Sequence, residues 1–148
     1  DLDAVVEQEA GQSIPEIVSR FGWPEFRRWE KAVVARYAAR SGQVLAAGGG
    51  VVLDEENVAI LKSTGRLIWL QASPATIQAR LGQDSRQTAS RPGLTGKGTM
   101  DEVEEVLAAR EPLYRAAAEV SLEVDEETPA ALARRLVELV RAWEQQNS

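Results

Sequence analysis

The chain has 148 residues, of which 44% are hydrophobic and 27% are charged, and its formal net charge is -6. This length suits one globular domain, and an acidic chain is a poor candidate for a nucleic-acid-binding protein. Cysteine and histidine are absent, which excludes disulfides, zinc–thiolate sites and acid–base catalysis by histidine. Neither an apolar run of about 18 residues nor a signal-like start occurs, so we expect a cytoplasmic protein without a membrane segment.

Helix-capping patterns mark the first part of the chain. Residues 13–16, SIPE, form a capping box that predicts a short helix ending at Gly22. Pro24 begins a longer helix, whose apolar residues recur at helical spacing until Gly42. Residues 1–3, DLD, have two interpretations. An extended segment would present both carboxylates to a hydroxyl and a water-bound metal, whereas a helix start would favour acidic residues through its dipole.

Three segments predict strands. Residues 43–47 and 67–70 are short apolar runs typical of buried strands, and residues 120–124 alternate apolar with polar side chains. Further helices are expected over residues 54–63, 73–81, 99–114 and 128–143, with a bend or a new start at Pro112. Strands separated by helices predict an α/β domain in which a parallel sheet lies between helical layers. Ligands of such sheets bind beyond the carboxyl ends of the strands, where Gly48, Gly49 and Gly50 follow the first run.

Residues 95–99, TGKGT, look like part of a phosphate-binding loop of the pattern G-x-x-x-x-G-K-[ST]. Arg91 stands where the first glycine belongs, and a polar segment precedes the motif in place of a buried strand. Thr99 is also explained as the cap of the next helix. We therefore interpret residues 83–98 as a lid loop, because long loops without apolar periodicity are commonly functional.

Three further motifs each allow two interpretations. Arg27 and Glu30 lie three residues apart on one helical face, either as a surface ion pair or with Glu30 orienting Arg27 toward a ligand carboxylate. The three glycines indicate a tight turn or a close approach of backbone to ligand, and the second explains their conformational cost better. Arg110 lies on the surface or reaches into a site.

Taken together and in order, the motifs resemble shikimate kinase, a family with the three-layer α/β/α fold of P-loop, nucleoside monophosphate kinase-like proteins. The matching segments are Asp1-x-Asp3, residues 13–17, Phe26-Arg27-x-x-Glu30, Gly48-Gly49-Gly50, Arg91-Pro92 and Arg110-x-Pro112-Leu113-Tyr114. They extend over nearly the whole chain. The ordered set is more specific than any of its members.

The resemblance implies transfer of the ATP γ-phosphoryl group to the 3-hydroxyl of shikimate, on the route to chorismate and the aromatic amino acids. Asp3 would bind the substrate hydroxyls and help to activate the attacking one. Arg27 and Arg110 would clamp the substrate carboxylate, a task suited to planar guanidinium groups. Glu30 would hold Arg27, and the backbone of Gly48, Gly49 and Gly50 would contact the substrate.

The resemblance also assigns the phosphate end of the reaction. Arg91 would close over the ATP phosphates and stabilise the charge that develops on the transferred group. Asp1 would approach Mg²⁺ through water. The implied ligands are shikimate, ATP and Mg²⁺, and the expected state is a monomer.

The sequence departs from the family at its start. We expect residues 1–148 to be a single shikimate kinase-like domain that lacks the family's first strands and phosphate-binding loop, so that this chain alone does not turn over ATP. Two alternatives remain: a related small-molecule kinase such as gluconate kinase, and a non-catalytic module that binds shikimate.

Overall fold

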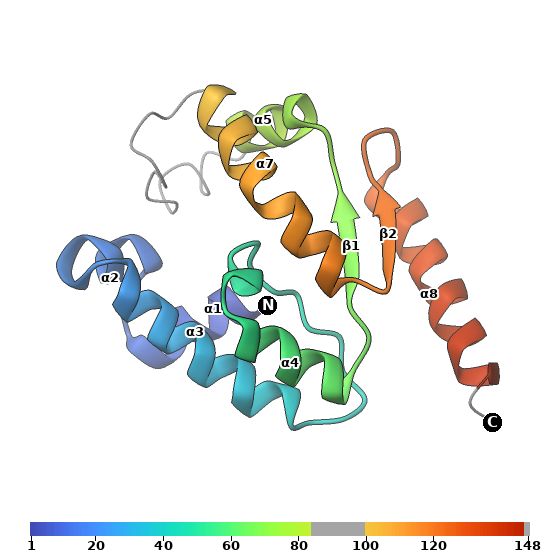
Figure 1. Cartoon of the computed structure of the whole chain (residues 1–148), viewed down its shortest axis with the longest axis horizontal. Coiled ribbons are helices and arrows are strands. Elements are labelled where there is room, and N and C mark those ends of the chain that lie inside the picture. The colour runs from blue at the N-terminus through green and yellow to red at the C-terminus, as the bar shows by residue number, and fades with distance from the viewer. Residues whose placement is uncertain (84–99, 147–148) are drawn as a thin grey trace.

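The computed structural model describes residues 1–83 and 100–146. Most of the expected lid loop, including Arg91 and Lys97, lies outside the described residues. A parallel pair of short strands, β1 (Ile68–Gln71) and β2 (Val120–Glu123), lies among the helices (Figure 1). The helical elements are α1 (Leu2–Ala10), α2 (Ile14–Phe21), α3 (Trp23–Ala38), the 3-10 turn η1 (Val51–Leu53), α4 (Glu55–Thr64), α5 (Pro74–Gln83), α7 (Met100–Ala117) and α8 (Pro129–Gln146).

Side-chain caps begin several helices where the sequence predicts them. The Ser13 hydroxyl accepts a hydrogen bond from the Glu16 N–H, and the Glu16 carboxylate accepts one from the Ser13 N–H at 2.8 Å. Asp54 and Thr128 cap α4 and α8 with their side-chain oxygens. These bonds satisfy N–H groups that have no partner inside a helix, so the predicted starts of α2, α4 and α8 are confirmed.

The first acidic pair belongs to a helix start. Asp1 is the N-cap of α1, and its carboxylate accepts a hydrogen bond from the Ala4 N–H at 3.0 Å. Asp3 lies in the first turn of the same helix. The extended interpretation of residues 1–3 is therefore wrong, because the chain is already helical from Leu2 and its dipole favours both carboxylates there.

Two of the three expected strands form. β1 and β2 pair in parallel with Ile68 opposite Val120, and this confirms that residues 67–70 and 120–124 contain strands. The expected burial of the first of them is wrong, since Leu70 is 53% exposed. Residues 43–47 form no strand in the described structure, which corrects the third prediction. The Ala46 carbonyl accepts one bond from the Leu2 N–H at 2.9 Å, and the Val44 side chain is 94% exposed. An apolar run becomes a strand only when a neighbour supplies a hydrogen-bond ladder.

The apolar core lies mainly between α1, α2, α3 and η1, on the side of the molecule away from β2 and α8 (Figure 1). Its buried members are Leu2, Val6, Ile17, Phe26, Val33, Val34, Val51, Val52 and Ala117. Ala117 belongs to α7, which packs against η1. The core therefore fixes α7 relative to the loop that precedes η1. In the described part of the chain, no helix combines the length and apolarity needed to cross a membrane.

α7 continues through its proline. It extends from Met100 to Ala117 with Pro112 inside. The expectation of a new helix start at Pro112 is therefore wrong. Arg110 and Tyr114 are four residues apart on this helix and consequently lie on the same face. The position of one side chain is therefore coupled to the position of the other.

The α2 capping box gives a stability prediction. Ser13→Ala removes the side-chain acceptor, and we expect the free energy of unfolding to fall by about 1 kcal/mol in urea denaturation. Ser19→Ala, an exposed change on the same helix, is the matched control and should leave stability nearly unchanged. Equal stability of the two variants would show that the cap contributes nothing.

Candidate functional site

A partly buried ion pair on α3 is the first component of the site. Nη1 of Arg27 lies 2.9 Å from both carboxylate oxygens of Glu30, and Glu30 is only 4% exposed. The spacing of three residues brings the two side chains onto one helical face. Burial of Glu30 argues against a fully exposed surface pair and favours the interpretation in which Glu30 orients Arg27. The ligand carboxylate on Arg27 stays a prediction.

Aromatic rings and a glycine hold the other sides of the Arg27 guanidinium. Its central carbon lies 5.1 Å from the centre of the Phe26 ring and 5.6 Å from that of the Trp23 ring, within cation–π range. A Cβ placed on Gly50 would lie 2.6 Å from the same carbon. Only a residue without a side chain therefore fits beside Arg27 in this arrangement.

The other two glycines also lie near polar side chains, at longer distances. A Cβ on Gly48 would lie 3.0 Å from Oδ1 of Asp3, and one on Gly49 would lie 3.8 Å from Nη1 of Arg110. Polar side chains lie beside the backbone of all three glycines. The approach of a ligand to this backbone stays a prediction. We call residues 48–50 the glycine loop. It brings Asp3 from α1, Arg27 from α3 and Arg110 from α7 into one neighbourhood.

The surroundings of Glu30 shift the pKa of its carboxyl group. Burial raises the pKa of the Glu30 carboxyl, the neighbouring Asp3 adds to the rise, and Arg27 and Arg110 oppose it. The direction shows that lost hydration outweighs the attraction of two guanidinium groups. Perturbed carboxylates beside cations are common at functional sites.

The arrangement can recognise a small acid that carries hydroxyl groups. Two guanidinium groups from different helices meet at the glycine loop, and guanidinium groups match carboxylates in shape and charge. Asp3 supplies an acceptor for a hydroxyl in the same place.

Seven of the nine residues predicted for the site come together in the structure. They are Asp3, Arg27, Glu30, Gly48, Gly49, Gly50 and Arg110. Asp1 caps α1, and Arg91 lies outside the described residues. Tyr114 is a further member, which the sequence marks only as part of a motif: its hydroxyl donates to the Gly49 carbonyl at 2.7 Å. Phe26 and Trp23 were also not assigned to the site, although their adjacency to Arg27 could have indicated stacking.

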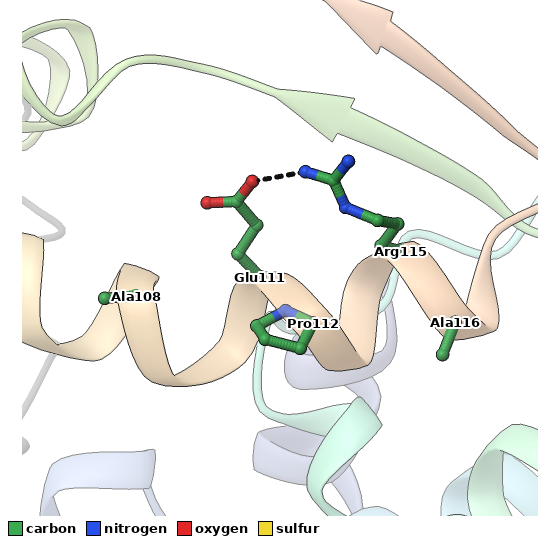
Figure 2. A pocket seen from close by; sticks show the side chains of 5 residues that line it. All are labelled: Ala108, Glu111, Pro112, Arg115 and Ala116. Carbon is green, nitrogen blue, oxygen red and sulfur yellow. Dashed lines mark hydrogen bonds and ion pairs between the residues drawn. The ribbon is translucent and has the colours of Figure 1, made fainter.

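A hollow of about 510 Å³ on another face of α7 lacks these groups. It is lined by Ala108, Glu111, Pro112, Arg115 and Ala116 (Figure 2). Figure 2 shows Glu111 and Arg115 joined to each other, at 2.6 Å, so their charges are mutually neutralised. We place the site at the glycine loop, because converging charged groups indicate a ligand better than an open hollow does.

Comparisons with known proteins indicate the family of the chain. The family model described as shikimate kinase matches residues 1–141. A shikimate kinase of Rhodopirellula baltica is 41% identical over 83% of this chain and 66% of its own length. One of Moorella thermoacetica is 39% identical over 97% of this chain and 79% of its own. The chain therefore spans about two thirds of the first relative's length and rather more of the second's.

Solved structures give the same family. A shikimate kinase from Acinetobacter baumannii in complex with shikimate superimposes with a TM-score of 0.85 at 28% identity, over 96% of this chain and 77% of the other. A shikimate kinase from Bacteroides thetaiotaomicron gives 0.82 at 27% identity, over 95% and 82%. The expected α/β fold of P-loop kinases is thereby confirmed.

The raised pKa of Glu30 gives a prediction for titration by carboxyl ¹³C NMR. Glu30 should ionise at a higher pH than Glu25, whose pKa is lowered mainly by its hydrogen bond with Arg28 on the same helix. Because the folded pKa of Glu30 is raised, its contribution to stability is complete below the unfolded pKa and is lost as pH rises through the folded value. Glu30→Gln should flatten that loss. A Glu30 midpoint at or below that of Glu25 would contradict the burial of this carboxyl.

Proposed function

Because the chain belongs to the shikimate kinase family, we propose that the protein transfers the γ-phosphoryl group of ATP to the 3-hydroxyl of shikimate. The observation that carries the proposal is the convergence of Arg27 and Arg110, from two helices, on one glycine loop beside Asp3. Shikimate presents one carboxylate and several hydroxyl groups on a ring, and these are the groups that such a site can bind.

The two arginines bind the substrate carboxylate. Arg27 uses Nη1 on Glu30 and keeps further N–H donors of its planar group for the ligand. Arg110 approaches the glycine loop from α7. A carboxylate between two guanidinium groups is held in orientation as well as in place, which fixes the ring that bears the reacting hydroxyl.

Asp3 acts on the hydroxyl that attacks. It is a carboxylate beside Gly48, in a chain that has no histidine or cysteine to serve as a base. In the transfer step the bond from the 3-oxygen to the γ-phosphorus forms and the bond from that phosphorus to ADP breaks. The hydroxyl proton moves to the Asp3 carboxylate. The contribution of the protein is mainly alignment and neutralisation of charge, as in phosphoryl transfer generally.

The phosphate end of the reaction involves Arg91 and Asp1. Arg91 would neutralise charge on the transferred group. In the described residues, no group of three His, Cys, Asp or Glu side chains could hold a metal ion. By resemblance to the family, Asp1 would contact the Mg²⁺ that accompanies ATP through water. When bound, Mg²⁺ supplies positive charge to the phosphates.

The proposal extends to the setting of the protein. We place it in the cytoplasm as a monomer that acts in the formation of chorismate and the aromatic amino acids. Its substrates are shikimate and ATP.

A substrate comparison tests the proposed function. The protein expressed from its whole gene should release ADP from ATP when shikimate is present, and calorimetry should show binding of shikimate but not of gluconate. Gluconate carries a carboxylate and hydroxyl groups on an open chain and lacks the ring. ADP release with gluconate and none with shikimate would support the related kinase instead. Binding of shikimate without ADP release would support a binding module.

The close fit of Gly50 against Arg27 gives a second prediction. Gly50→Ala displaces the guanidinium, and we expect affinity for shikimate to fall by about 10- to 100-fold, the value of a lost charge-assisted hydrogen bond. Gly65→Ala is the matched control, because its backbone is extended and its new Cβ would make an ordinary contact of 3.7 Å. Shikimate affinities that are equal in the two variants would remove Arg27 from the binding site.

A further inference from the structure

Tyr114 connects three parts of the molecule. Its hydroxyl donates a hydrogen bond of 2.7 Å to the Gly49 carbonyl, 65 residues earlier in the chain. Its ring stacks on Trp69 of β1, with ring centres 5.6 Å apart and planes at 29°. The stacking fixes the ring, and the fixed ring places the hydroxyl. α7, the strand and the glycine loop therefore meet at one side chain.

The bond to Tyr114 differs from the other bonds of the glycine loop. The Gly48 carbonyl accepts from the Val51 N–H and the Gly50 carbonyl from the Leu53 N–H, both at 3.1 Å and both within the local turn. The Gly49 carbonyl accepts from another element. The local turn would thus survive the loss of Tyr114, but the orientation of the Gly49–Gly50 peptide relative to α7 would not be held.

The Gly49–Gly50 peptide lies beside Arg110 and Arg27. A trans peptide directs its C=O and N–H in opposite directions, and the chain has no cis peptide in its described part. With the Gly49 carbonyl turned to α7, the Gly50 N–H points away from α7. A Cβ on Gly49 would lie 2.8 Å from the Tyr114 hydroxyl oxygen and 3.8 Å from Nη1 of Arg110, so both side chains approach the same peptide.

We infer that Tyr114 is a positioning residue for shikimate binding. Its hydroxyl orients the Gly49–Gly50 peptide and fixes the distance between Arg110, one turn earlier on α7, and the glycine loop. The inference rests on the proposed function, because it names the group that sets the geometry of the carboxylate clamp. It assigns a role to the last residue of the Arg110-x-Pro112-Leu113-Tyr114 motif, which the substrate contacts leave unexplained.

The test compares the two tyrosines of the chain. Tyr114→Phe removes the hydroxyl and keeps the ring on Trp69, and Tyr37→Phe makes the same change on α3, away from the glycine loop. The KM and Kd for shikimate should rise about 5- to 10-fold in Tyr114→Phe, the value of one hydrogen bond. The KM for ATP and the melting temperature should match those of Tyr37→Phe. A purely structural role would shift all four quantities together and would overturn the inference, as would no difference between the two variants.

A second pair of variants tests the contact itself. Gly49→Ala places its Cβ against the Tyr114 hydroxyl, so shikimate affinity should fall less for Gly49→Ala in the Tyr114→Phe background than in the parent. Equal losses in both backgrounds would contradict the contact.

Hydrogen exchange at the Gly50 N–H, followed by NMR, separates this inference from the proposed function, because it requires no ligand. Exchange should be faster in Tyr114→Phe than in Tyr37→Phe, since the peptide is no longer held. Failure of the parent protein to bind shikimate would reject the proposed function, and the exchange rates would still decide the role of Tyr114. Equal exchange rates in the two variants would overturn the inference that Tyr114 orients the Gly49–Gly50 peptide.

Discussion

The arrangement of the site depends on the partly buried ion pair of Arg27 with Glu30 against Gly50. Removing Glu30 from water is unfavourable, in line with its raised pKa, and this cost offsets the attraction of the pair. The pair instead fixes the orientation of the Arg27 guanidinium. Glu30 accepts a hydrogen bond from one nitrogen of the Arg27 guanidinium, and two aromatic rings lie within cation–π distance of this group. Gly50 has no side chain, so the guanidinium can lie close to the loop. Asp3 and Arg110 reach the same loop beside this cation.

The other charged groups reach the glycine loop from separate elements. Asp3 comes from the first turn of α1 and Arg110 from the middle of α7, while the core holds both helices against η1 and α3. The chain as a whole is acidic, yet two guanidinium groups meet here beside two carboxylates. Net charge therefore says little about the ligand, whereas the local arrangement indicates an anion that also carries hydroxyl groups.

Local features of the sequence were predicted best. The capping residues Ser13, Asp54 and Thr128 act within a few residues of themselves, so their helices could be foreseen. Residues 43–47 failed as a strand because pairing depends on a distant partner that an apolar pattern does not reveal. Residues 1–3 could be read as extended or helical, and the cap at Asp1 decided the question.

The site was predicted in its members but not in its geometry. Spacing alone cannot distinguish the Arg27–Glu30 pair from the exposed Glu25–Arg28 pair on the same helix, because both are three residues apart. Burial makes the difference, and burial comes from the packing of the whole domain. The bond from Tyr114 to Gly49 joins residues 65 positions apart, so no local pattern could have shown it.

The central claim is that Arg27 and Arg110 together hold the carboxylate of shikimate at the glycine loop. A crystal structure of the protein with shikimate tests it most directly. The carboxylate should lie within hydrogen-bond distance of both guanidinium groups, with a ring hydroxyl on Asp3. Shikimate bound elsewhere, or bound with its carboxylate away from both arginines, would contradict the account.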